Sequence, residues 1–200
     1  ALVAVKRTFT GAIATTQHDW HEKQEINAVS DAGVPNNGTT NAETALNAAI
    51  AAAANKTLYI PAGTYLFDQI RITSPIRIRT DGPLTIFKRT TTSKSNNSHV
   101  EIACSNVELE GFASTGNISA DTGEKCPALA IQNVSGTGAT LIENIKVGVI
   151  QATDIRGDCL TINGVAACLV RHVRVEGVLS KNIWRSRVSI FGGEDIRIGF

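Results

Sequence analysis

Short segments in which apolar and polar residues alternate recur along the chain after residue 70. In one set, each segment turns two apolar residues to one side and a charged residue to the other. Its members are Pro75-Ile-Arg-Ile-Arg79, Asn106-Val-Glu-Leu-Glu110, Asn144-Ile-Lys-Val-Gly148, His172-Val-Arg-Val-Glu176 and Asp195-Ile-Arg-Ile-Gly199. A second set is shorter and comprises Val100-Glu-Ile102, Leu129-Ala-Ile131, Leu160-Thr-Ile162 and Val188-Ser-Ile190. Both sets predict short β-strands with one face in a core.

The spacing of these segments predicts a solenoid. They recur roughly every 20 to 40 residues with variable insertions, which is typical of stacked coils and not of a β-sandwich. Two insertions, Thr90–Ser98 and Gly116–Pro127, are rich in Ser, Thr, Asn and Gly, so we expect exposed loops there. An alternating strand runs almost to Phe200, and we expect further coils to follow in the complete protein.

A single helix is predicted before the first coil. Thr40 and Glu43 have the spacing of a capping box, and an Ala-rich stretch follows them, so we expect a helix from near Asn41 to about Asn55. The segment Thr57–Ile60 then reads as a strand that ends at a proline. A helix laid over this first strand would cover backbone groups that otherwise invite edge pairing.

The same region resembles a known family signature. Asp31-Ala-Gly-Val-Pro-Asn-Asn-Gly-Thr-Thr-Asn-Ala-Glu-Thr-Ala-Leu-Asn-Ala-Ala-Ile50, followed by Leu58-Tyr-Ile-Pro-Ala-Gly-Thr-Tyr65, is similar to the N-terminal signature of pectate-lyase-like proteins. The resemblance implies an all-β fold, a right-handed parallel β-helix with an N-terminal capping α-helix. It also implies that the protein binds or cuts polysaccharides. On this basis residues 31–200 form the capping helix and the first coils.

The preceding residues, 1–30, resemble the neck of bacteriophage tailspikes, because a polar lead-in (His18-Asp-Trp-His-Glu-Lys-Gln-Glu25) runs directly into the signature. This resemblance implies a homotrimer on the virion tail, made in the host cytoplasm, that depolymerises a bacterial surface polysaccharide by hydrolysis or β-elimination. Two other functions stay open. One is a secreted, monomeric hydrolase or lyase of the pectin-degrading type. The other is a non-enzymatic receptor-binding or structural module.

Composition excludes several classes. A net charge of +1 gives no reason to expect a nucleic-acid partner, and no apolar run is long enough to insert into a membrane. The four cysteines, Cys104, Cys126, Cys159 and Cys168, show neither CxxC pairing nor histidines at zinc-ligand spacing. We therefore expect buried free thiols, typical of a reducing compartment, and neither a metal site nor a cofactor.

If the strands stack in register, the outward positions of the first set form a column that is mostly basic: Arg77, Glu108, Lys146, Arg174 and Arg197. Lys146, Arg174 and Arg197 are candidates to bind an acidic polysaccharide. The alternative is an ordinary solvated sheet face. A second column, Asn106, Asn144, His172 and Asp195, falls where the chain turns, and side chains at such turns bond to one another and to the backbone.

Candidate catalytic carboxylates come from a second resemblance. Asp154-Ile-Arg-Gly-Asp-Cys-Leu-Thr-Ile-Asn-Gly164 looks like the paired-aspartate strand of polygalacturonases, in which Asp158 matches the second aspartate and Gly157 replaces the first. Carboxylates on adjacent or alternate coils would lie about 5 or 10 Å apart, which brackets the separations that glycosidases use. The catalytic candidates are therefore Asp154, Asp158 and Glu176, with Arg185 and Arg187 as further substrate ligands. The alternative for each acid is a turn or surface carboxylate.

Overall fold

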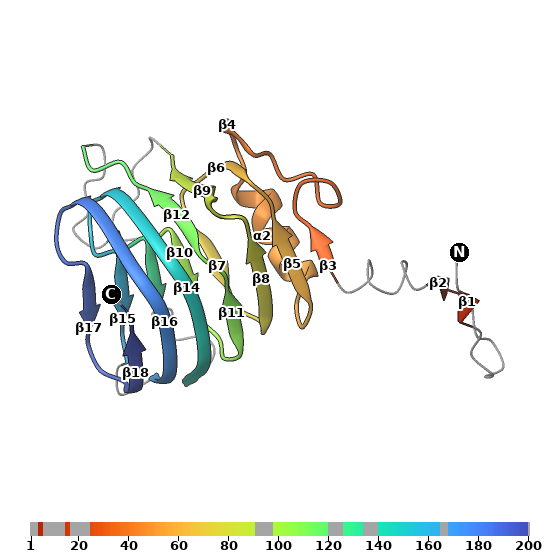
Figure 1. Ribbon diagram of the computed structural model, residues 1–200. Helices are drawn as coiled ribbons and strands as arrows, with labels where there is room; N and C mark the ends of the chain where they lie inside the picture. Colours follow the sequence, from red (N-terminus) through yellow and green to blue (C-terminus); the bar gives the residue numbers. More distant parts are fainter. Residues whose placement is uncertain are drawn as a thin grey trace.

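The computed structural model describes residues 4–5, 15–16, 25–90, 98–119, 126–133, 140–164 and 168–199. Its described strands stack as the coils of a right-handed parallel β-helix (Figure 1), so the predicted fold class is confirmed. Away from this stack, the two-residue strands β1 (Ala4–Val5) and β2 (Thr15–Thr16) pair with each other in antiparallel fashion. Most of the predicted neck therefore lies outside the described residues.

The strands of the stack lie on three faces. The first face contains, in order along the stack, β3 (Glu25–Asn27), β5 (Thr57–Ile60), β8 (Ile76–Thr80), β11 (Val107–Leu109), the first part of β14 (Leu141–Ile155), the first part of β16 (Leu169–Ile183) and β18 (Glu194–Ile198). Every neighbouring pair is parallel and in register, and these strands include the whole predicted first set. The face begins with β3, because Ile26 pairs with Leu58 ahead of the predicted boundary at residue 31.

The second face continues from the first around a corner. It contains β4 (Asn37–Asn41), β6 (Gly63–Phe67), β9 (Gly82–Arg89), β12 (Phe112–Thr115) and the later parts of β14 and β16. In the later coils this corner is turned within one long strand, as the two longest arrows in Figure 1 show. The third face contains β7 (Ile70–Ile72), β10 (Val100–Ile102), β13 (Leu129–Ile131), β15 (Leu160–Ile162) and β17 (Val188–Ile190), which include the whole predicted second set.

The core fills the space between the faces with columns of aliphatic side chains. Alternation with period two turns every second residue inward, and parallel register then stacks like on like: Ile72, Ile102, Ile131 and Ile162 follow one another and are fully buried. Four aromatic rings extend the core under the second face. The Phe87 ring lies at their centre, and its centroid is 5.0 to 6.2 Å from those of Tyr65, Phe67 and Phe112, in edge-to-face or tilted pairs.

Helix α2 (Glu43–Ala52) was predicted, but it covers β7 at the start of the third face and not the strand Thr57–Ile60, whose edge is paired with β3. The predicted capping box is also wrong. The N-cap residue is Ala42, without a side-chain cap. Glu43 instead reaches the next coil, where its Oε2 accepts the Asp68 N–H at 2.9 Å. The helix is also shorter than expected, because Asn55 turns the chain into β5 with a positive φ of 60°. The Glu43 carboxylate therefore binds backbone N–H groups of the next coil and does not cap its own helix.

Turns between the faces use residues that tolerate the left-handed conformation. The predicted turn column is confirmed, because Asn106, Asn144, His172 and Asp195 all have φ between 49° and 60°. Asn144 Nδ2 donates to Asn106 Oδ1 at 3.1 Å, which ties one coil to the next. These turns fix where each strand starts and hence which residues line the outer surface.

The four cysteines are buried and free, as predicted. Burial raises the pKa of the Cys104 and Cys159 thiols to about 11, so both stay protonated and unreactive near neutral pH. Within the described residues, no helix has the length and apolar character needed to cross a bilayer. In the same residues, no group of three or more His, Cys, Asp or Glu side chains is arranged to hold a metal ion.

Candidate functional site

The outward side of the first face carries the predicted basic column. The paired strands align Arg77 with Glu108, Glu108 with Lys146, Lys146 with Arg174, and Arg174 with Arg197. Because the neighbouring positions face the core, these side chains project to solvent one above another, about 4.8 Å apart from coil to coil. The sequence therefore predicted this column correctly.

A second outward column lies two residues further along each strand. Tyr59 aligns with Arg79, and continuing the register by one residue adds Glu110, Gly148 and Glu176. Only Glu176 of this column was a candidate in the sequence. The signal for the rest was present, since Arg79, Glu110, Gly148 and Glu176 all hold the last position of the first-set segments.

Three adjoining hollows follow these columns along the face. The largest, of about 890 Å³, lies between the turn column and the basic column, and its lining includes Asn144, His172, Lys146 and Arg174. A second, of about 310 Å³, lies over Gly148. A third, of about 490 Å³, lies between Arg174 and Arg197. Lys146 and Arg174 line the first two hollows, and Arg174 lines all three, so we treat them as one groove, the first-face groove.

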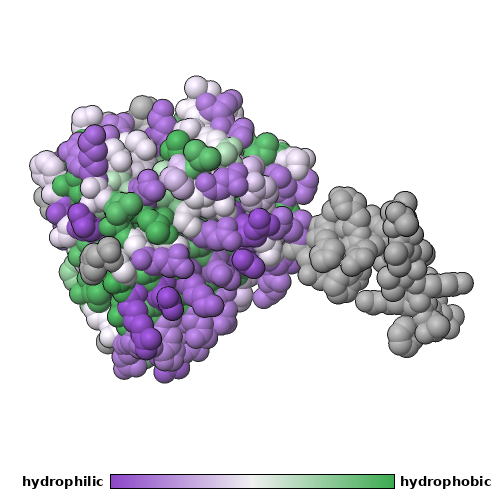
Figure 2. Space-filling model, in the orientation of Figure 1, coloured by the Kyte–Doolittle hydropathy of each residue, from purple (hydrophilic) through white to green (hydrophobic). Residues whose placement is uncertain are grey.

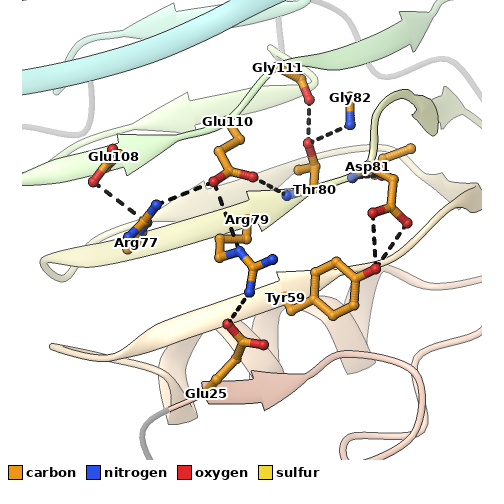
Figure 3. A network of polar contacts seen from close by, with 11 residues as sticks. Glu25, Tyr59, Arg77, Arg79, Thr80, Asp81, Gly82, Glu108, Glu110 and Gly111 are labelled. Carbon is orange, nitrogen blue, oxygen red and sulfur yellow. Dashed lines mark hydrogen bonds and ion pairs between the residues drawn. The ribbon is translucent and has the colours of Figure 1, made fainter.

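The N-terminal part of the groove is electrostatically self-compensated. Arg77 lies 3.7 Å from Glu108 and 3.4 Å from Glu110, and Arg79 binds Glu25 at 2.7 Å (Figure 3). The bond to Glu25 raises the pKa of Arg79. Tyr59 lies beneath the Arg79 guanidinium, 5.3 Å from the ring centroid. Hydrophilic residues gather on this side of the molecule (Figure 2), and in this part of the groove Arg77 and Arg79 are already paired with carboxylates.

The C-terminal part of the groove carries uncompensated charge. Among the described residues, Lys146 and Arg174 are exposed and have no ion pair within 4.0 Å, whereas Arg197 pairs with Asp195 at 3.0 Å. His172 stands at the rim, with its Nδ1 3.8 Å from Glu143. The exposed Glu176 likewise has no ion pair within the described part of the chain. The cations available to an incoming anion are therefore concentrated on β14 and β16.

The two candidate aspartates lie outside the groove, at the turns between the second and third faces. Asp158 is 3 % exposed; it accepts the Ser186 N–H at 3.0 Å and the Thr161 hydroxyl at 3.1 Å. Asp154 has a φ of 56° and accepts from Asn182 Nδ2 at 2.5 Å. Both carboxylates join one coil to the next, and the structure does not bring them together with Glu176.

The two remaining candidate ligands, Arg185 and Arg187, also lie on the far side of the stack from the groove. Arg185 Nε is 4.0 Å from Asp158 Oδ1, and Arg187 Nε donates to Ser180 Oγ at 3.1 Å. Of the predicted site residues, the structure therefore gathers Lys146, Arg174, Arg197 and Glu176 on one surface. Asp154, Asp158, Arg185 and Arg187 form a separate group at the turns around β15 and β17.

Comparison with models of protein families shows which family the chain matches. Residues 26–163, more than half of the chain, match the model of the family described as rhamnogalacturonase A/epimerase, pectate lyase-like. The chain belongs to this rhamnogalacturonase A/epimerase family. The resemblance found at Asp31–Tyr65 is thereby confirmed, and the matched span contains most of β3, the helix and the coils as far as β15. No curated protein gives a significant match to the chain.

The chain is also similar to several solved structures. A candidate glycosyl hydrolase from Parabacteroides merdae is 12% identical with a TM-score of 0.49, and the match covers 83% of this chain and 95% of that one. A 1,3-α-1,4-β-D-galactose-4-sulfate-3,6-anhydro-D-galactose-2-sulfate 4-galactohydrolase is 19% identical (TM-score 0.49; 87% and 43% coverage). An iota-carrageenase of family GH82 from A. fortis is 21% identical (TM-score 0.47; 87% and 39% coverage). This chain therefore spans less than half of the length of the latter two proteins.

Proposed function

We propose that the first-face groove binds an acidic polysaccharide and that the protein degrades it. The observation that carries this proposal is the pair of exposed, unpaired cations, Lys146 and Arg174, on adjacent strands inside a continuous groove. At the other end of the groove Arg77 is already paired with Glu108, so it is less available to an anionic ligand. A guanidinium also binds a carboxylate or sulfate through two parallel hydrogen bonds, which suits an anionic sugar.

The dimensions of the groove fit a chain better than a single small molecule. The hollows adjoin along the stack, and the basic column presents one side chain per coil, about 4.8 Å from the next. A linear polymer with anionic groups along it can therefore engage several coils at once. Membership of the rhamnogalacturonase A/epimerase family supports a polysaccharide as the ligand.

Hydrolysis is the reaction that the groove supports, because Glu176 lines it beside Arg174. A carboxyl group next to a bound sugar can protonate a leaving oxygen or activate water. Elimination is the alternative and would need a base near the sugar carboxylate, a role open to Lys146, Arg174 or His172. New reducing ends without unsaturated uronates in the products would distinguish hydrolysis from elimination.

The test of binding uses polygalacturonate and a charge-matched control. We expect the double variant Lys146→Gln/Arg174→Gln to bind about fivefold more weakly at low salt, since two exposed ion pairs contribute about 1 kcal/mol. The variant Lys88→Gln/Lys181→Gln removes the same charge from the outward side of the second face and should bind like the wild type. Equal losses in both variants, or affinity that does not depend on salt, would contradict a specific groove.

The second predicted set of ligands is tested in parallel. Arg185→Gln/Arg187→Gln removes Arg185, which lies 4.0 Å from Asp158, together with Arg187, which binds Ser180. If the groove on the first face is the binding surface, this variant keeps wild-type affinity for polygalacturonate. A loss confined to this variant would move the site to the turns that carry Asp154 and Asp158.

The finer form of the proposal is a phage tailspike depolymerase, a homotrimer on the virion tail whose substrate is a bacterial surface glycan. Its support is the resemblance of residues 1–30 to a tailspike neck. Light scattering on the complete protein should then give three chains. A monomer would support the secreted pectin-degrading alternative, and glycan binding without any cleavage would support the non-enzymatic module.

A further inference from the structure

We propose that Glu108 determines the specificity of the first-face groove: it admits an uncharged sugar to the middle of the largest hollow and excludes an acidic one. This inference rests on the proposed function and refines the ligand of the same groove. Among the described residues, Glu108 is the one carboxylate that lines the hollow of about 890 Å³. The other lining residues with a permanent charge are cations, namely Lys56, Arg77, Lys146 and Arg174.

Cations stand at both ends of this hollow, with Glu108 between them. Lys146 lies one coil after Glu108, about 4.8 Å further along the stack, and Arg174 follows on the next coil. Lys56 lies at the opposite end, directly before Thr57, which is two coils and roughly 10 Å before Glu108. Lys56 is exposed and, like Lys146, has no ion pair within 4.0 Å among the described residues. The hollow therefore presents positive charge at each end and negative charge in its middle.

The Glu108 carboxylate remains accessible to a ligand. Its ion pair with Arg77 is long, at 3.7 Å, and the side chains of Arg77 and Glu108 are 50% and 45% exposed (Figure 3). Arg77 also lies 3.4 Å from Glu110, so one positive charge is shared between two carboxylates. Exposed pairs of this kind are weak, because water screens them and mobile side chains must be held in place. Glu108 therefore still repels a second carboxylate that is brought next to it.

The groups around Glu108 suit the hydroxyl groups of an uncharged sugar. Asn106 and Asn144 line the same hollow, and Asn144 Nδ2 donates to Asn106 Oδ1 at 3.1 Å, which holds both amides in place. An amide can both donate to and accept from a hydroxyl group, and a carboxylate accepts strong hydrogen bonds from hydroxyls. A sugar without an acidic group can therefore bind in the middle of the hollow, while acidic sugars elsewhere in the same chain reach the cations at its ends.

The arrangement favours a polysaccharide whose acidic groups are separated along the chain. In a polymer with an acidic group on every sugar, a group bound at Lys146 or Arg174 brings a neighbouring one towards Glu108. Repulsion there cancels part of the attraction at the two cations, and specific interfaces commonly use such a repulsive element against the wrong ligand. Glu108 thus selects by the spacing of charge along the ligand and not by its total amount.

The experiment measures calorimetric binding of two polymers at low salt: polygalacturonate, and the same polymer with alternate carboxylates on average converted to methyl esters. We expect Glu108→Gln to bind polygalacturonate about fivefold more tightly than the wild type, because it removes the repulsion of an exposed charge. Its affinity for the esterified polymer should change by less than about twofold. Glu194→Gln is the control. It removes the same charge from β18, outside all three hollows, and should bind both polymers like the wild type.

Glu108→Asp separates the charge of Glu108 from its contact with Arg77. Aspartate is one methylene shorter, so it retracts from the 3.7 Å contact but keeps a negative charge in the hollow. We expect Glu108→Asp to keep the wild-type affinity for polygalacturonate within about twofold. A gain equal to that of Glu108→Gln would show that the release of Arg77 raises the affinity, and it would overturn the inference. The urea midpoint of each variant checks that it is folded.

The outcomes separate this inference from the proposed function. If the wild type binds polygalacturonate but Glu108→Gln gains no affinity, or gains equally for both polymers, the role of Glu108 is overturned and the groove stands. A gain that Glu194→Gln shares, or one that persists at high salt, also overturns it, because neither fits repulsion at one place in the hollow. If the wild type binds neither polymer, the proposed function is overturned and this inference with it.

Discussion

Asn47 of α2 pairs with the backbone on both sides of Ile70 in the way a neighbouring strand would. Its Oδ1 accepts the Arg71 N–H at 3.2 Å, and its Nδ2 donates to the Gln69 carbonyl at 3.4 Å. β7 is the first strand of the third face and would otherwise present an open edge on this side. The Asn47 amide therefore makes, on this side of β7, two of the backbone hydrogen bonds that a preceding strand would make.

We predict that Asn47→Ala lowers the free energy of unfolding by about 1 to 3 kcal/mol, because it leaves backbone groups without partners. Asn47→Asp keeps the acceptor and should cost less. Thr44→Ala, at an exposed position of the same helix, serves as the control and should be neutral or slightly stabilising. Urea unfolding measures all three, and a neutral Asn47→Ala would show that the edge needs no such cover.

Gly148 and Gly177 give a matched pair of glycine substitutions within the two long strands. An alanine Cβ at 148 would meet the backbone of Gly111 at 2.4 Å, whereas at 177 its nearest neighbours are Val149 methyl groups at 3.6 and 3.8 Å. We predict that Gly148→Ala destabilises the protein by about 1 to 3 kcal/mol. Gly177→Ala should stay within about 0.5 kcal/mol of the wild type.

The urea midpoints of the two variants test this difference directly. Equal midpoints would mean that the coils can shift apart at the corner without cost. Gly148 also lines the hollow of about 310 Å³ on the first face, whereas Gly177 does not.

His99 makes stability depend on pH. The ring is 1 % exposed, and its Nδ1 lies 2.8 Å from Ser114 Oγ. Burial, reinforced by the nearby Arg89 guanidinium, lowers the pKa of His99 to about 3, from about 6.5 in the unfolded chain. Between these values the unfolded chain binds more protons than the native protein, so stability is lost as the pH falls from about 6.5 towards 3.

The predicted loss across this range is on the order of 5 kcal/mol from His99 alone. His99→Gln removes the titration, so its free energy of unfolding should fall less steeply than that of the wild type over the same range. The measurement is a series of urea titrations between pH 7 and 4. Parallel slopes for the two proteins would contradict a neutral, buried His99.

Most of the architecture could be predicted from the sequence because the relevant interactions are local. Alternation in segments such as Asn144–Gly148 determines which residues face the core, and the Asn residues before the strands mark left-handed turns. The helix over the first coil was predicted for the same reason. Its capping box was wrong, because Glu43 binds backbone N–H groups of the next coil, which no local spacing reveals.

The residues of the candidate site also fall into those that the sequence predicted and those whose surroundings depend on the tertiary structure. Lys146, Arg174 and Arg197 were found because a repeated motif aligns them even before the coils are built. Asp154 and Asp158 were selected by resemblance along a single segment, and the burial of Asp158 and the coil-to-coil bonds of both depend on residues such as Asn182 and Ser186, about 28 residues later. Which carboxylates share a hollow is a property of neighbouring coils.

By itself, then, the sequence determined the family, the repeating strands, the capping helix and the basic column, since each follows from side-chain order within one coil. Only the tertiary structure decided that Asp154 and Asp158 lie apart from the basic column, and that Lys146 and Arg174 have no carboxylate partner among the described residues. The physical reason is that stacking sets the register between coils of unequal length. The register between coils, and not the position in the chain, therefore decides which charged side chains lie next to one another.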